Sequence, residues 1–190
     1  FTRNTTDYHM DPTTGYVAEG SVEFAGLGGD EKFVKYIADY RHFWPVFWST
    51  VFSVHGQVGY ISQLGGEEIP VDERFYLGGL HSLRGFKSRE VGPYDPANDE
   101  FTGGDKAAFF NIEYLFPILK DAGLKGVVFF DGGNAWGEDE DYFSEMRYSV
   151  GAGLRWMSPM GPLRLEWGYN LDPMDYEDTS EFEFSIGKFY

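Results

Sequence analysis

Apolar and polar residues alternate along most of this chain. From Met146 to Trp156 the even-numbered positions are apolar or aromatic, while the odd-numbered positions carry Arg, Ser and Gly. A period of two residues places one kind of side chain on each face of a β-strand. No segment shows a competing helical pattern, so the chain is predicted to be all-β and antiparallel. The pattern predicts nine strands, at residues 1–8, 15–27, 32–44, 47–62, 105–116, 123–133, 146–157, 161–171 and 180–190.

Strand length and loop length favour a transmembrane β-barrel over a soluble β-sandwich. Most predicted strands have about ten residues or more, the length that a tilted strand needs to cross a bilayer. Their apolar faces carry aromatic residues near the ends, such as Trp156 and Trp167, as expected at a membrane interface. Short connections such as 45–46 alternate with longer ones such as 137–145, which is typical of outer-membrane barrels.

The composition excludes one class of partner. The chain has 15 basic and 31 acidic residues, a net charge of −16. Nucleic-acid binding needs a basic face, so we expect no nucleic-acid partner. The chain contains no Cys, so it needs neither a disulfide nor a thiolate metal site. We expect no metal and no cofactor.

One long connection, residues 63–104, contains the triplet Arg84-Gly85-Phe86. A guanidinium binds a carboxylate through two parallel hydrogen bonds. Asp131 falls on the same face of its predicted strand as Val127 and Phe129, where an unpaired carboxylate would be costly. Arg84 is therefore the expected partner of Asp131, with Glu113 and Glu166 as second candidates. In the alternative interpretation, Arg84 is a solvated loop charge and Asp131 caps a turn.

Four segments of the chain carry a resemblance to known proteins. They are RFYLGGLHSLRGF (74–86), FFDGGNAW (129–136), RWMSPMGPL (155–163) and FEFSIGKFY (182–190), with a weaker match in TRNTTDYHMDPTTGY (2–16). In this order they resemble the BamA-type family of outer-membrane assembly factors and two-partner secretion transporters. The resemblance covers nearly the whole chain and implies the C-terminal eight or nine strands of a sixteen-stranded barrel in the bacterial outer membrane. It also implies that the long loop folds into the lumen and is locked there by Arg84, Gly85, Phe86, Asp131 and Glu166.

The last predicted strand carries a separate signal. Phe182, Phe184, Ile186 and Tyr190 share one face, and Gly187 is expected to loosen the edge. The resemblance implies that this strand is recognised by the assembly machinery and pairs with the first strand of the barrel. In the alternative, it is an ordinary closing strand.

The resemblance implies a non-catalytic assembly factor that inserts and folds β-barrel proteins. Its expected partners are unfolded outer-membrane proteins, the lipid bilayer, and periplasmic lipoproteins bound through periplasmic domains that this chain lacks. The alternatives are a two-partner secretion transporter and a short homologous barrel of structural role. An enzyme is disfavoured, because no Gly-x-Ser-x-Gly motif and no His-rich metal spacing accompany the four His residues. We expect residues 1–190 to be part of one longer barrel domain.

Overall fold

The computed structural model describes residues 1–26, 32–64, 69–187 and 189–190. They form one antiparallel sheet of nine strands in the order β1-β2-β3-β4-β7-β8-β9-β10-β11, and a short hairpin of β5 and β6. The main strands are β1 (Thr2–Asn4), β2 (Gly15–Ala25), β3 (Phe33–Pro45), β4 (Val51–Gln63), β7 (Lys106–Leu119), β8 (Leu124–Trp136), β9 (Arg147–Ser158), β10 (Gly161–Asn170) and β11 (Ser180–Ile186). The hairpin is β5 (Tyr94–Asp95) and β6 (Glu100–Phe101), and the 3₁₀ turns are η1 (Val71–Glu73) and η2 (Lys120–Ala122).

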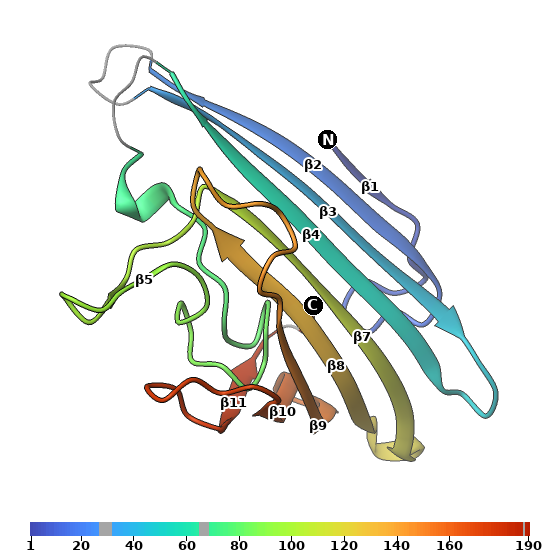
Figure 1. Ribbon diagram of the computed structural model, residues 1–190. Coiled ribbons are helices and arrows are strands. Elements are labelled where there is room, and N and C mark those ends of the chain that lie inside the picture. Colours follow the sequence, from blue (N-terminus) through green and yellow to red (C-terminus); the bar gives the residue numbers. More distant parts are fainter. Residues whose placement is uncertain (27–31, 65–68, 188) are drawn as a thin grey trace.

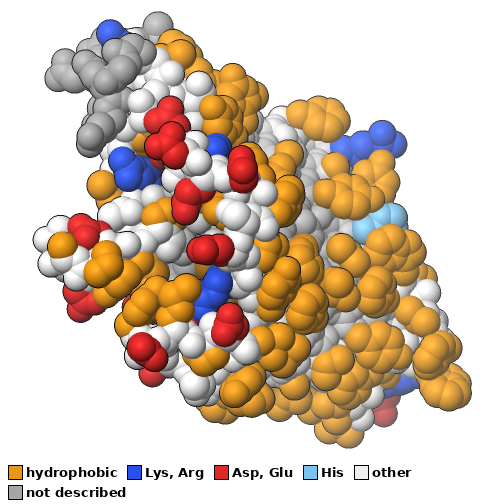
Figure 2. All heavy atoms as spheres, viewed as in Figure 1, with side chains coloured by type: hydrophobic (Ala, Val, Ile, Leu, Met, Phe, Trp, Pro, Cys, Tyr) orange, Lys and Arg blue, Asp and Glu red, His pale blue; other side chains and the backbone are white. Residues whose placement is uncertain are grey.

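The exposure of the two faces of the sheet is the reverse of that in a soluble protein, because the apolar face is exposed and the polar face is buried. In β10, Leu165, Trp167 and Tyr169 are exposed, whereas Arg164 and Glu166 are 5% and 1% exposed. Hydrophobic side chains accordingly form a broad area over the strands, and acidic side chains gather over the loops (Figure 2). A soluble sandwich would bury the apolar face instead. The predicted all-β barrel architecture is therefore confirmed, with its apolar face outward.

The strands lie side by side as a curved sheet, and the segment between β4 and β7 lies on its concave side (Figure 1). Within the described residues, β1 pairs only with β2 and β11 only with β10, so the sheet is not closed. The helices of the described part of the chain are single 3₁₀ turns, and none is long or apolar enough to span a membrane.

All nine predicted strands are present, but several of them begin or end elsewhere. β1 ends at Asn4 rather than at residue 8, because Asp7 accepts hydrogen bonds from the backbone N–H groups of Thr13 and Thr14 and folds residues 5–14 into a turn. β4 begins at residue 51 rather than 47, since a tight turn precedes it. Residue 27, residues 65–68 and Lys188, which belong to predicted elements, lie outside the described residues.

The last strand ends earlier than predicted. β11 stops at Ile186, and Gly187 follows with φ of +113°, a backbone conformation that L side chains rarely adopt. The chain then leaves the outer surface, so that Phe189 is 2% exposed and Tyr190 packs edge-on against Phe43 with ring centroids 5.0 Å apart. The prediction that Tyr190 shares the outer face with Ile186 is wrong.

The turn at residues 5–14 reaches across the concave side of the sheet to β8. The carboxylate Oδ2 of Asp11 lies 2.6 Å from Nζ of Lys125 on β8, although 114 residues separate them in the sequence. The neighbouring Pro12 is buried. The ion pair therefore connects β8 with a turn that precedes β2, across the concave side.

This connection predicts a specific cross-link. A carbodiimide should join Asp11 to Lys125 in the folded full-length protein, because an amide bond forms only between a carboxylate and an amine already in contact. Mass spectrometry of the digested protein should detect the joined peptides. Asp11→Asn should abolish the product, and its absence from the unchanged protein would contradict this placement of the turn.

Candidate functional site

Apolar side chains hold the long loop against the concave face of the sheet. Leu83 and Phe86 of the loop are buried together with Phe109 of β7 and Ala135 of β8. A side chain–backbone hydrogen bond of 2.6 Å, from Asn111 Nδ2 to the Ser82 carbonyl, fixes the same stretch. These contacts bring the Arg84-Gly85-Phe86 triplet onto the polar side of β7, β8 and β10.

Arg84 is 1% exposed and binds carboxylates on β7, β8 and β10. Its Nε and Nη2 donate to the two oxygens of Asp131 at 2.7 and 2.6 Å. Its Nη1 donates to Glu113 at 2.6 Å and to Glu166 at 2.7 Å. The guanidinium carbon also lies 3.5 Å from the centre of the Phe129 ring. The structure thus brings Arg84 together with Asp131 and with both second candidates.

Two further arginines complete this group. Arg155 of β9 donates to Glu113 at 2.6 Å and to Glu166 at 2.8 Å, and Arg164 of β10 donates to Glu166 at 2.8 Å. We call the whole set the arginine–carboxylate cluster. It contains three arginines and three carboxylates, so its formal charges balance. Its members are Arg84, Arg155, Arg164, Glu113, Asp131 and Glu166.

The cluster joins the loop to four consecutive strands, β7 to β10. Burial by itself lowers the pKa of Arg84, but the facing carboxylates of Asp131 and Glu113 raise it above its ordinary value. The guanidinium therefore stays charged inside the protein. Removing one partner of such a buried set leaves uncompensated charge, which costs about 3–5 kcal/mol.

The loop backbone touches the sheet at the triplet's glycine. Gly85 has φ of +88°, and a Cβ on it would lie 2.9 Å from the carbonyl carbon of Gly168 on β10. A Cβ on Gly168 would in turn collide with the backbone nitrogen of Gly85. Two glycines facing each other therefore allow the loop to approach closely enough for Arg84 to reach its carboxylates.

Phe86 completes the predicted triplet. Its side chain is 3% exposed and belongs to the apolar group that also contains Leu83 and Ala107. The guanidinium carbon of Arg147 on β9 lies 5.3 Å from the centre of its ring. Phe86 thus contributes packing beside the arginine–carboxylate cluster.

The residues of the closing-strand signal divide between two environments. Phe182, Phe184 and Ile186 are exposed on the outer face. The hydroxyl of Tyr190 instead lies inside, 2.8 Å from Nη1 of Arg155. Nη1 of Arg164 donates to the carbonyl of Phe189 at 3.0 Å, so the C-terminus also contacts the cluster.

Sequence reasoning did not single out Arg155, Arg164 or the inward position of Tyr190. A signal for the two arginines was present, because both occupy polar positions of the alternating pattern. Alternation places a residue on a face but does not say which residues of that face meet across strands.

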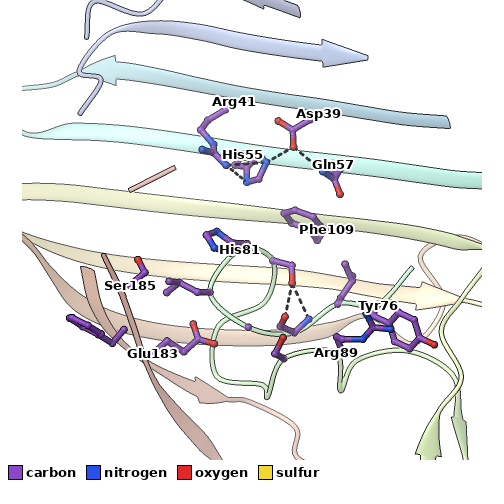
Figure 3. A pocket seen from close by; sticks show the side chains of 17 residues that line it. Asp39, Arg41, His55, Gln57, Tyr76, His81, Arg89, Phe109, Glu183 and Ser185 are labelled. Atoms are coloured by element: carbon purple, nitrogen blue, oxygen red, sulfur yellow. Dashed lines mark hydrogen bonds and ion pairs between the residues drawn. The ribbon is translucent and has the colours of Figure 1, made fainter. Parts of the chain in front are cut away.

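A second polar group lines a cavity of 740 Å³ between the sheet, the loop and β11. His55 Nε2 lies 2.7 Å from Asp39 Oδ2, and His55 Nδ1 lies 2.9 Å from Asn111 Oδ1. The ring of His55 therefore connects Asp39 of β3 with Asn111 of β7. Figure 3 shows Asp39 and His55 on one wall of the cavity, with Glu183 and Ser185 of β11 on another. Across the described residues, no group of three or more His, Asp or Glu could hold a metal ion.

An outward apolar sheet whose polar concave face holds a folded-in loop is the architecture of part of a membrane β-barrel. The Omp85 superfamily domain matches residues 1–190. The chain is 39% identical to the outer membrane protein assembly factor BamA of Nitratidesulfovibrio vulgaris, over 100% of this chain and 25% of that protein. It is 30% identical to BamA of Neisseria meningitidis serogroup B, over 97% of this chain and 27% of that protein.

The fold has a match among solved structures. The crystal structure of BamA from Haemophilus ducreyi lacking POTRA domains 1–3 superposes with a TM-score of 0.84 at 23% identity, covering 96% of this chain and 40% of that one. The chain belongs to the Omp85 superfamily and is an integral part of the bacterial outer membrane. It spans about a quarter of the length of the two BamA proteins.

Proposed function

We propose that the protein to which this chain belongs inserts and folds β-barrel proteins in the bacterial outer membrane. The observation that carries the proposal is the 39% identity to an outer membrane protein assembly factor, which extends over the whole chain. Two-partner secretion remains the alternative, but neither BamA relative carries that name. In this proposal the protein acts without covalent catalysis.

The cluster has a proposed role in this function. Arg84, Gly85 and Phe86 lock the long loop in the lumen, with Asp131 and Glu166 as the carboxylates of the barrel wall. The distances of 2.6 to 2.8 Å around Arg84 and the close approach of Gly85 to Gly168 support this role. The lock fixes the curvature of β7 to β10, and so the shape of the barrel that meets the bilayer.

The open sheet supports a proposal about the domain. Residues 1–190 form the C-terminal part of one barrel domain, and the remaining strands complete a sixteen-stranded barrel. Periplasmic domains elsewhere in the full-length protein bind the lipoproteins of the assembly complex. Unfolded outer-membrane proteins are the clients, and Phe182, Phe184, Ile186, Gly187 and Tyr190 form the signal of the closing strand.

Reconstitution of the full-length protein tests the assembly function. Urea-unfolded β-barrel clients of unrelated sequence should fold faster in vesicles that contain the protein than in protein-free vesicles. The folded fraction is measured as the band that shifts in electrophoresis without heating. Vesicles with the heat-inactivated protein are the control. Failure to accelerate any client, together with passage of one dedicated partner protein, would instead favour the secretion transporter.

A further inference from the structure

The connection between β8 and β9, residues 137–146, folds outward over the apolar face of the sheet. The hydroxyl of Tyr142 donates to the carbonyl of Gly59 on β4 at 2.8 Å. Nζ of Lys106 on β7 donates to two backbone carbonyls of the connection, at 2.7 and 2.8 Å. The connection therefore crosses the ends of β7 and β4 on the side of the sheet that faces lipid.

Aromatic rings beneath this connection keep it in place. Trp136 lies on the same face of β8 as the exposed Val128, yet Trp136 is only 1% exposed. The centre of its six-membered side-chain system lies 5.5 Å from the ring centre of Tyr142 and 6.0 Å from that of Phe143. Its Nε1 donates to the carbonyl of Ser144 at 2.7 Å. The connection is thus packed on an outward-facing residue, while Phe143 itself remains exposed.

A groove runs beside this connection on the outer face of the sheet. Two adjoining hollows of 320 and 430 Å³ share Ala38 of β3 and Val58 of β4. Gly20 of β2 lies opposite Ala38, which in turn lies opposite Val58. Ala108 of β7 continues this row on the other side of Val58. The row crosses four strands and contains a single side chain larger than a methyl group, and we call it the outer groove.

No side chain of the described residues fills the outer groove. A Cβ on Gly20 would meet no other heavy atom within 4 Å. A Cβ on Gly56, which also lines the groove, would meet only a backbone oxygen, at 3.7 Å. Large rings stand at the edge instead, where Tyr36 and Tyr60 stack with their centres 6.5 Å apart. Packing within the sheet does not require these small residues, and they leave room for a molecule from outside.

The outer groove has the dimensions of one hydrocarbon chain. Neighbouring strands lie about 4.8 Å apart, so a row across four strands is about 14 Å long. The hydrocarbon layer of a single leaflet is about 15 Å deep, half of the bilayer core. The groove belongs to the exposed apolar face, so it is continuous with the surface that contacts the membrane. Its occupant is therefore expected to come from the lipid.

The β8–β9 connection also identifies the leaflet. It is one of the longer connections, and outer-membrane barrels have their longer loops on the outside of the cell. Ala108 lies two residues from the start of β7 at this end. The groove therefore opens into the outer leaflet, which in this membrane consists of lipopolysaccharide with saturated acyl chains. A straight row across the strands suits such a chain, because it lacks the kink of a cis double bond.

We propose that the outer groove binds one saturated acyl chain of a lipopolysaccharide molecule, and that Phe143 and Met146 of the β8–β9 connection hold the chain there. Both residues border the groove together with Tyr40 and Phe110. A chain enclosed between the strands and the connection has fewer lipid neighbours, so it exchanges more slowly than lipids elsewhere on the outer face. The site is independent of the assembly function, since it lies on the opposite side of the sheet from the arginine–carboxylate cluster.

Native mass spectrometry of the full-length protein tests this inference, because loosely attached lipids dissociate from the detergent-solubilised protein and an enclosed lipid stays bound. The probe is purified lipid A, and unsaturated phosphatidylethanolamine is the comparison lipid. One lipid A molecule should remain on the unchanged protein. Ala38→Leu fills the groove and should lower the bound fraction several-fold. Ala152→Leu, on the exposed outer face of β9 beyond the groove, is the matched control and should leave the bound fraction unchanged.

Three results would overturn the proposal. Equal binding of lipid A by the two Leu variants would place the lipid elsewhere. Phosphatidylethanolamine retained as strongly as lipid A would show that the groove does not select the outer-leaflet lipid, and a second protein chain retained in its place would assign the groove to a protein. Phe143→Ala opens the groove without adding bulk and should also lower the bound fraction, which guards against a folding defect of Ala38→Leu. The heat-modifiable band in electrophoresis verifies that each variant is folded.

Discussion

Replacing Arg84 by Met is expected to lower the free energy of unfolding by about 3–5 kcal/mol, the usual cost of breaking a buried charge set. The substitution leaves Asp131, Glu113 and Glu166 buried with two arginines instead of three. Met fills much of the volume of the Arg84 side chain. The lost free energy of unfolding therefore results from the missing charge rather than from a cavity. Urea unfolding of the full-length protein in lipid, followed by the electrophoretic shift, measures the change.

Lys87 provides a matched control in the same loop. It forms an ion pair with Asp178 at 2.5 Å, but the pair is exposed to solvent. Lys87→Met removes the same kind of charge and should leave the unfolding midpoint unchanged. A midpoint for Arg84→Met equal to that of Lys87→Met would show that the cluster is not what holds the loop.

A double-mutant cycle assigns part of the loss to one pair. If Arg84 binds Asp131, then Arg84→Met combined with Asp131→Asn should be less destabilising than the sum of the single changes, by about 0.5–3 kcal/mol. Asp131→Asn alone leaves Arg84 with two carboxylates, so it should cost less than Arg84→Met. Additive effects would contradict the pairing.

Gly168→Ala is expected to have the second largest effect, a loss of about 3 kcal/mol at the upper end of overpacking costs. The added methyl group meets the backbone of Gly85, which has no flexible side chain that could move aside. The loop must shift, and Arg84 then moves away from its carboxylates. The same unfolding experiment measures the loss.

Gly20→Ala is the matched control for this substitution. Gly20 lies in β2, and a Cβ at this position would meet nothing within 4 Å. The control should therefore retain the stability of the unchanged protein. Equal, small effects of both substitutions would show that the loop does not approach β10 as closely as described.

The alternating pattern was sufficient to predict most of the fold. The alternating residues from Arg164 to Asn170 can each be assigned to one face, because successive side chains of a pleated strand point to opposite faces. The strand ends were harder, since they depend on local turn chemistry. Asp7 ends β1 early through its hydrogen bonds to Thr13 and Thr14, and Gly187 ends β11 through its backbone conformation.

The site was only partly predictable for a different physical reason. An expected partner of Arg84 could be found because an acidic residue stood in an apolar run at Asp131. The contributions of Arg155 and Arg164 depend on the register between β9 and β10, in which these two residues lie opposite each other. The sequence pattern of a single strand does not determine that register. The inward course of Tyr190 likewise results from packing against Phe43.

Cysteine labelling tests most directly whether the cluster holds the loop in the lumen. Ser82→Cys, at a position that is 9% exposed, and Asn98→Cys, at an exposed position of the same loop, are treated with a polymer-linked maleimide added outside intact cells. We expect rapid labelling at residue 98, protection at residue 82, and loss of that protection when Arg84→Met is added. Equal labelling at residues 82 and 98 with Arg84 in place would contradict it.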